Sequence, residues 1–180
     1  MQLAKGHAVQ NSLAGKVGLT LAATALIAIS AKIQVPFWPV PMTLQTMAVM
    51  GLAVVLGPRL GLAAMGTYLA AGAAGLPVFA GAAAGPAYLA GPTAGFLLGM
   101  LLAMGLTGAL AQGRGTIGRG AAMLAGLAAI YVPGLLWLSN FVPSEKVLAA
   151  GFTPFILGDL VKLVVALMLI EGARRLTRRA

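Results

Sequence analysis

Near the end of the chain stands the stretch Thr153-Pro-Phe-Ile-Leu-Gly-Asp159-Leu-Val-Lys162-Leu-Val-Val-Ala-Leu-Met-Leu-Ile170, in which an acid and a base lie three residues apart in an otherwise apolar run. Thr153 and Pro154 favour a helix start, because a Thr hydroxyl caps backbone N–H groups and Pro lacks the N–H that would have no partner there. Residues three apart share one face of a helix. The stretch therefore predicts a helix on which Asp159 and Lys162 point in the same direction.

The predicted helix is long and apolar enough to be a membrane span. At roughly 1.5 Å per residue, Lys162 lies about 12 Å below the helix start, near the middle of a hydrocarbon core roughly 30 Å thick. Ionisable groups at this depth usually face a cavity or the protein interior, because each charge costs roughly 2.5–3.5 kcal/mol to insert. We therefore expect a polar pocket at Asp159 and Lys162. The alternative is a structural ion pair that has no ligand.

The composition is that of a polytopic membrane protein with one domain. The chain has 180 residues, of which 60% are hydrophobic and 8% charged, and its mean hydropathy is +0.98. The absence of Cys excludes disulfides, thiolate metal sites and a Cys nucleophile, and the single His7 leaves no material for a His-based site.

Neither ATP hydrolysis nor other enzyme chemistry has visible residues. The segment Ala14-Gly15-Lys16-Val17 lacks the earlier Gly and the Ser or Thr of a phosphate-binding loop. The sequence also has no Gly-x-Ser-x-Gly elbow and no paired catalytic carboxylates. We expect no cofactor in this chain, and any energy that its function needs must come from a partner or a gradient.

The sequence predicts an all-α membrane protein with six transmembrane helices. The domain organisation is a polar N-terminal segment 1–16, a six-helix domain 17–172 and a basic tail 173–180. A cleaved signal peptide is the alternative for the first run, since Ala28-Ile-Ser30 resembles a cleavage site. Lys32, at the end of that run, is expected to snorkel to the interface. The six apolar runs are 17–35, 43–56, 62–74, 93–111, 121–138 and 153–170.

Glycine and proline mark the turns, the breaks and one packing face. A tight turn is expected at 57–61, and Pro133-Gly134 is expected to kink the fifth run. The fourth run carries small residues at steps of four, which favour close helix packing. These are Gly91, Gly95, Gly99, Ala103, Thr107 and Ala111.

Two connections are candidates for the pocket walls. The prolines of 36–41 favour extended backbone, and Trp38 is either a pocket wall or an interfacial anchor. The segment 76–92 is apolar but too rich in Gly and Pro to be one helix, and such backbone needs cover at membrane depth. We interpret it as a re-entrant loop over the site, with a flexible linker as the alternative. Further candidates for ligand contact are Gln45, Phe79, Tyr88 and Asn140.

The charges predict the orientation. Six spans put both termini on one side, and that side collects nine positive residues, whereas the other side has only Lys146, balanced by Glu145, and the helix-end Lys32. By the positive-inside rule the termini are cytoplasmic and the Pro- and Gly-rich connections face outward. The net charge of +9 therefore reports topology, and nucleic-acid binding is not expected. The nine residues are Lys5, Lys16, Arg59, Arg114, Arg119, Arg174, Arg175, Arg178 and Arg179.

With this orientation, the pocket opens to the outside. A carboxylate accepts N–H bonds, an ammonium meets a carbonyl or carboxylate, and apolar walls cover hydrocarbon. The pair therefore suits a small amphiphilic solute with hydrogen-bond donors and an acceptor or anionic group.

Five short segments follow one another along the chain in a distinctive order and spacing. They are Pro39-Val-Pro41-Met-Thr43-Leu-Gln45, Leu56-Gly-Pro-Arg59-Leu-Gly61, Gly75-Leu-Pro-Val78-Phe-Ala-Gly81, Gly91-Pro-Thr-Ala-Gly95 and Gly158-Asp159-x-x-Lys162. Together they resemble the BioY family, the biotin-specific substrate-binding (S) components of energy-coupling factor (ECF) transporters. The resemblance covers about residues 20–170.

The resemblance implies the S-component fold, a bacterial or archaeal inner-membrane location, and biotin as a substrate bound from outside by Asp159 and Lys162. It also implies a toppling motion and coupling to a transmembrane T component and two ATPase subunits that use ATP. The alternatives are an S component for another vitamin and a non-transporting membrane scaffold.

Two segments differ from the family pattern. The run Gly81-Ala-Ala-Ala-Gly85 has no polar residue, so no side-chain ligand is assigned there. The first run lacks the Ala-x-x-x-Ala that contacts the T component, and Thr24-x-x-x-Ala28 is the nearest substitute, with Thr20 one turn earlier. A self-associating form without dedicated partners therefore stays open.

Overall fold

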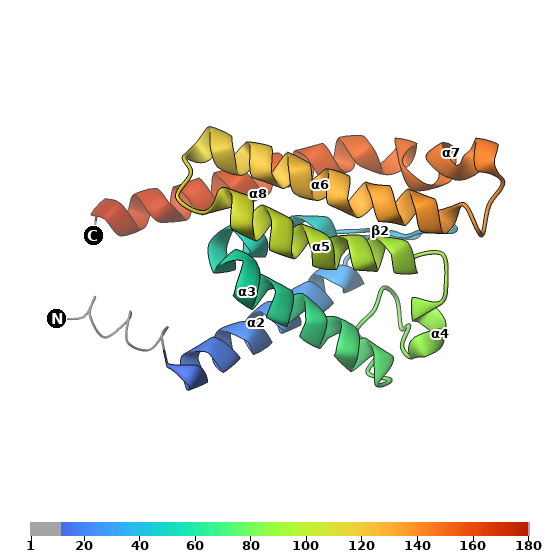
Figure 1. Ribbon diagram of the computed structural model, residues 1–180, viewed down its shortest axis with the longest axis horizontal. Coiled ribbons are helices and arrows are strands. Elements are labelled where there is room, and N and C mark those ends of the chain that lie inside the picture. Colours follow the sequence, from blue (N-terminus) through green and yellow to red (C-terminus); the bar gives the residue numbers. More distant parts are fainter. Residues whose placement is uncertain (1–11, 180) are drawn as a thin grey trace.

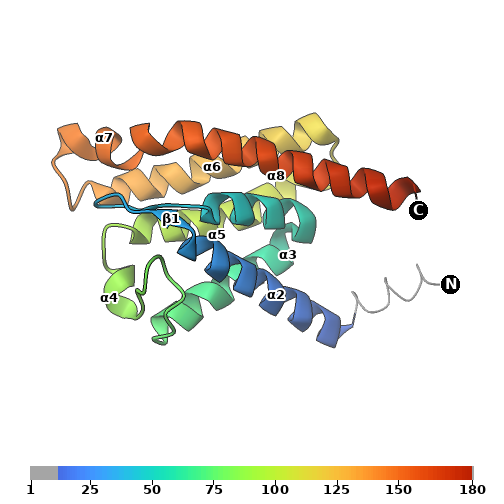
Figure 2. The ribbon, with the colours of Figure 1, turned by 180° about the vertical axis from the view of Figure 1, so that it is seen from behind.

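The computed structural model describes residues 12–179 of the protein, almost all of them helical (Figure 1). The long helices lie side by side, and α8 ends at the end of the molecule opposite to the hairpin, α4 and α7 (Figures 1 and 2). The elements are α2 (Leu13–Lys32), β1 (Gln34–Val35), β2 (Met42–Thr43), α3 (Gln45–Ala73), α4 (Pro86–Leu89), α5 (Ala94–Ala111), α6 (Thr116–Leu138), the 3-10 turn η1 (Ser144–Lys146), α7 (Val147–Gly151) and α8 (Thr153–Arg179).

Six apolar helical segments are present in the described part of the chain. Five helical stretches there are long and apolar enough to cross a membrane, and α3 is one of them. Helix α3 breaks at Gly57, whose φ of 75° is the left-handed conformation that glycine adopts without strain. Gln45 and Tyr68 line one cavity, although a straight helix would hold them about 35 Å apart. Thus α3 doubles back and contributes two segments.

These features confirm the predicted all-α membrane fold and correct several boundaries. The expected turn at 57–61 is a single-residue break at Gly57. Helix α6 begins at Thr116 rather than at 121 and continues through Pro133. Helix α8 continues from the expected span through the basic tail to Arg179. A two-stranded hairpin is the exception to the helical fold, with Gln34 paired to Thr43.

The N-terminal boundary also differs from the prediction. Helix α2 begins at Leu13, where the backbone N–H of Gly15 donates to the Ser12 hydroxyl at 3.0 Å, so Lys16 is already helical. The expected polar segment 1–16 lies largely outside the described residues, and Lys5 and His7 are among those not described.

The contact between α5 and α6 is made by backbone against backbone. A Cβ on Gly95 would lie 2.5 Å from the Pro133 carbonyl oxygen, and a Cβ on Gly99 would lie 2.7 Å from Ile130 Cα. The predicted small-residue stripe is thus a packing surface, and its five positions within α5 are buried: Gly95, Gly99, Ala103, Thr107 and Ala111.

Two ion pairs are found within residues 12–179. One joins α6 to α8 through Arg119 Nη1 and Glu171 Oε1, toward the end of the molecule at which α8 finishes. The other is Asp159 with Lys162, which lies on the cavity described next. The two pairs offer a comparison between an ion pair at a cavity and one away from it.

Candidate ligand-binding site

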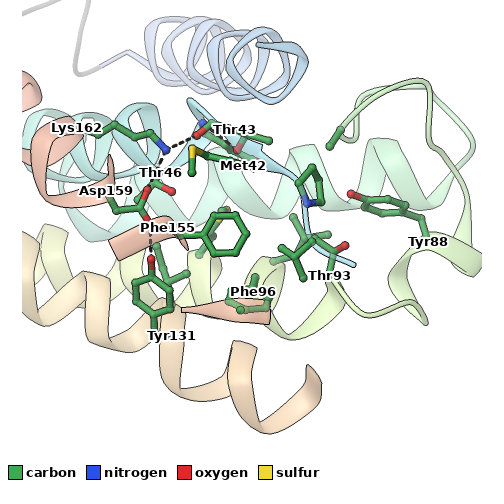
Figure 3. A pocket seen from close by; sticks show the side chains of 18 of the residues that line it. Met42, Thr43, Thr46, Tyr88, Thr93, Phe96, Tyr131, Phe155, Asp159 and Lys162 are labelled. Atoms are coloured by element: carbon green, nitrogen blue, oxygen red, sulfur yellow. Dashed lines mark hydrogen bonds and ion pairs between the residues drawn. The ribbon is translucent and has the colours of Figure 1, made fainter. Parts of the chain in front are cut away.

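A cavity lies where the hairpin, the folded-back α3, α5, α6 and the start of α8 meet (Figure 3). Helix α8 contributes Phe155, Asp159 and Lys162 to the lining, because these residues recur at helical spacing on one face. The volume open to the centre of a water molecule is about 50 Å³, so the lining side chains leave little free space. Movement of one wall would make room for a bulky ligand.

Asp159 is the centre of a hydrogen-bond network in this cavity (Figure 3). Its Oδ1 accepts from Lys162 Nζ at 2.9 Å, and its Oδ2 accepts from the Tyr131 hydroxyl at 2.7 Å. Lys162 Nζ also donates to the Thr43 carbonyl oxygen at 2.7 Å. The network ties α8 to α6 and to the hairpin, and Asp159 is buried. The opposite charge and the hydrogen bonds give both buried groups the partners that burial would otherwise remove.

The network retains capacity for a ligand. A carboxylate has about four lone-pair directions, and Tyr131 and Lys162 use two of those of Asp159. An ammonium has three N–H donors, and two of those of Lys162 are used. A solute with both an N–H donor and an acceptor therefore finds both partners at one end of the cavity.

The remaining walls are apolar or aromatic. Met42, Phe96, Met100, Ile130 and Phe155 line the cavity beside the polar network. Such walls exclude water and favour the hydrocarbon part of a ligand. The site therefore suits an amphiphilic solute of the kind that the sequence predicts.

An aromatic stack forms the wall opposite α8. Tyr88 lines the cavity and stacks on Phe79, with ring centroids 4.9 Å apart, and Tyr68 meets Phe79 edge-on at 5.5 Å. Burial raises the pKa of the Tyr88 phenol, which therefore stays neutral and keeps its hydrogen-bond donor. Phe79 itself is fully buried and does not line the cavity, so it supports Tyr88 from behind.

The predicted site residues are only partly brought together. Asp159, Lys162, Gln45 and Tyr88 line one cavity, whereas Trp38 is 86% exposed and does not line it. The extended 36–41 connection carries the Trp38 ring outward, a position that suits the alternative of an interfacial anchor.

One predicted candidate lies away from the cavity, and two residues that line it were not singled out from the sequence. The Asn140 side chain donates to the carbonyl of Trp137 at the end of α6 and does not line the cavity. Tyr131 and Tyr68 line the cavity and were not predicted. The signal for both was a tyrosine inside an otherwise apolar run.

Comparison with known proteins identifies the family of this chain. The sequence model of the BioY family matches residues 5–179. The chain belongs to the BioY family. The biotin transporter BioY of Thermotoga maritima is 41% identical over 155 residues, 85% of this chain and 92% of that protein. The probable biotin transporter BioY of Pyrococcus horikoshii is 39% identical over 158 residues, 88% of this chain and 95% of that one.

A solved structure agrees with this membership. The crystal structure of the S-component for biotin from an ECF-type ABC transporter superposes with a TM-score of 0.78 and 28% identity, over 89% of this chain and 90% of that one. The predicted resemblance and fold are therefore confirmed, and this BioY-family chain is a multi-pass membrane protein. Its relatives are named as transporters, which agrees with a non-enzymatic function.

In this BioY-family chain, the predicted docking residues lie along one side of α2. The Thr24 hydroxyl donates to the Ala64 carbonyl of α3 at 3.0 Å, so part of this side is used within the chain. The Thr20 hydroxyl donates to the carbonyl of Lys16 in its own helix at 2.8 Å, and Ala28 is half-buried. Partner docking through Thr20, Thr24 and Ala28 stays a prediction.

Lys32, which the sequence predicts to snorkel to the interface, is exposed and has specific partners within the protein. Lys32 Nζ donates to three backbone carbonyls of the connection between α3 and α4, those of Pro77, Phe79 and Gly81. The Lys32 side chain therefore fixes the position of this connection. The connection includes Phe79, whose ring packs against Tyr88.

Proposed function

We propose that this chain binds biotin from the outer side of the membrane and delivers it inward as the S component of an ECF-type importer. The observation that carries the proposal is the Asp159–Lys162 pair, which lies on a cavity and retains unused hydrogen-bonding capacity. The names of the relatives and of the solved S-component point to the same vitamin.

Biotin matches the chemistry of this cavity. Its ureido ring carries two N–H donors and a carbonyl, which suit a carboxylate and an ammonium on one helix face. Its sulfur-containing ring and aliphatic chain suit the walls made by Met42, Phe96 and Phe155. A solute without the ureido group would leave the buried charges without new partners, so the cavity discriminates against it.

Charge and placement together support an outward opening. The break of α3 beside Arg59, the turn at Arg114 and the end of α8 lie at one end of the molecule, and the hairpin, α4 and α7 lie at the other (Figure 1). We infer that the basic end is cytoplasmic by the positive-inside rule. The cavity, which lies beneath the hairpin and beside Tyr88, then faces the side from which biotin arrives.

Titration of the purified protein with biotin tests the proposal. We expect saturable binding and a melting temperature that rises with biotin concentration, because a ligand that binds only the folded state stabilises it by about 2.7 kcal/mol at 100 times its Kd. Thiamine and riboflavin are the matched competitors. Stabilisation by one of these and not by biotin would assign another vitamin, and stabilisation by none would favour a scaffold.

Docking to the T component is tested on α2. We expect Thr20→Trp to reduce co-purification with the T component and ATPase subunits encoded in the same genome by at least tenfold, because a bulky ring prevents close helix approach. Biotin affinity should not change. Thr67→Trp is the matched control, since Thr67 is also half-buried and also donates to a carbonyl of its own helix at 2.8 Å. Equal capture of both variants would place the docking surface elsewhere.

A further inference from the structure

Lys32 makes an unusual set of contacts for a lysine at a helix end. It is the last residue of α2, and its Nζ lies 2.5 Å from the carbonyl oxygen of Pro77 and 2.6 Å from those of Phe79 and Gly81. An ammonium has three N–H donors, so all of them are directed at one short segment of backbone. Charged donors make the stronger class of hydrogen bond.

The segment that Lys32 holds positions the aromatic wall of the cavity. Phe79 fills a space that exists because residue 72 is glycine, since a Cβ there would lie 2.1 Å from Phe79 Cζ. The buried Phe79 ring then supports Tyr88, whose ring lines the cavity. A shift of the carbonyls of Pro77 and Gly81 would therefore move Phe79 and, through it, Tyr88.

This wall is the one suited to move. Little free space lies in the cavity, so an outward movement of one wall would ease the entry of a bulky ligand. The walls from α5, α6 and α8 belong to long packed helices, and the hairpin wall is tied to α8 by the bond from Lys162 Nζ to the Thr43 carbonyl. The 76–92 connection, by contrast, contains only the four-residue α4. Outside its own turns, a further backbone bond to this connection runs from Gly85 N to the Gly72 carbonyl at 2.7 Å.

We propose that Lys32 is a positioning residue that latches the 76–92 connection over the cavity and thereby sets the rate at which the ligand enters and leaves. Because Lys32 terminates α2, the latch joins the helix predicted to dock the T component to the wall of the cavity. The statement about ligand exchange rests on the proposed function. The statement about the latch does not.

Amide hydrogen exchange on the ligand-free protein tests the latch alone. We expect Lys32→Met, which keeps the length of the side chain but has no donor, to speed exchange in residues 77–85 by at least tenfold and to leave α5 and α6 unchanged. Lys32→Arg, which keeps charged donors, should restore slow exchange. Lys146→Met is the matched control, because it removes an exposed positive charge from the same end of the molecule.

Biotin release measured on the same variants tests the consequence. Lys32→Met should release biotin at least tenfold faster than Lys146→Met, and Lys32→Arg should approach the parent rate. If Lys32→Met does not fold, Lys32→Gln takes its place, with the same direction expected. Exchange in 77–85 equal to that of the control overturns the latch, and faster exchange with unchanged release overturns its role in ligand exchange. Failure of the parent to bind biotin rejects the proposed function and leaves the exchange result to decide the latch.

Discussion

Biotin affinity is expected to fall at least 100-fold in Asp159→Asn and in Lys162→Met, a loss of about 2.8 kcal/mol at 1.4 kcal/mol per tenfold. Each substitution removes a charged hydrogen-bond partner from the cavity. Because both groups are little exposed to water, their hydrogen bonds to a bound ligand are stronger than bonds made in water. Direct titration of each folded variant with biotin measures the effect.

The double variant, measured for both stability and biotin affinity, separates a ligand site from a structural ion pair. Removing one member of a fully buried pair costs roughly 3–5 kcal/mol, because the other charge is left without its partner. The Lys162 and Asp159 side chains are 12% and 9% exposed, so the single variants should be clearly destabilised. Asp159→Asn combined with Lys162→Met leaves no unpaired charge. It should recover much of the melting temperature and none of the biotin affinity.

The Arg119–Glu171 pair provides the control. It joins α6 to α8, whereas both members of the Asp159–Lys162 pair lie on α8, and neither Arg119 nor Glu171 lines the cavity. Arg119→Met combined with Glu171→Gln should therefore leave biotin affinity at the parent value. Biotin binding by the Asp159→Asn, Lys162→Met variant that equalled the parent would show that the pair is structural and that the site is assigned wrongly.

Local sequence signals accounted for most of the fold. The apolar runs, the stripe that includes Gly95 and Gly99, and the helix start at Thr153 all depend on neighbouring residues, and each has its counterpart in the structure. The Thr153 hydroxyl, however, donates to the Leu148 carbonyl at 3.2 Å, which is not the predicted capping of a backbone N–H. The bend at Gly57 is different. Glycine and proline predict a break there. That the chain reverses direction at a single residue depends on how both halves of α3 pack against the rest of the protein, which no local pattern indicates.

The site was predictable where charge was involved and less so elsewhere. Asp159 and Lys162 stand out because ionisable groups are rare in apolar helices. Tyr131 reaches Asp159 from a different helix, and Lys32 reaches carbonyls that have no side-chain signature in the sequence. Such contacts join residues 28 and 47 positions apart, respectively, so no local pattern indicates them.

Gly99→Ala is expected to destabilise the protein and to weaken its binding site. The added Cβ would lie 2.7 Å from both Cα and the carbonyl oxygen of Ile130 and 2.8 Å from the carbonyl of Ala129, so α5 and α6 would have to separate. Overpacking of this kind costs about 1–3 kcal/mol. Thermal unfolding in detergent measures it. Gly66→Ala is the matched control, because nothing lies within 4 Å of its Cβ position and Ala stabilises a helix interior by roughly 0.5–1 kcal/mol relative to Gly.

The two effects of Gly99→Ala have one cause. Gly99 fixes the backbone of α6 at Ile130, and the next residue is Tyr131, whose hydroxyl holds Asp159 Oδ2 at 2.7 Å. A shift of α6 by a few tenths of an ångström would lengthen that bond and misplace the carboxylate. Biotin affinity should therefore fall together with the melting temperature in Gly99→Ala and stay unchanged in Gly66→Ala. A Gly99→Ala variant with parent stability but weakened binding, or with lost stability and parent affinity, would show that helix spacing and carboxylate position are not coupled in this way.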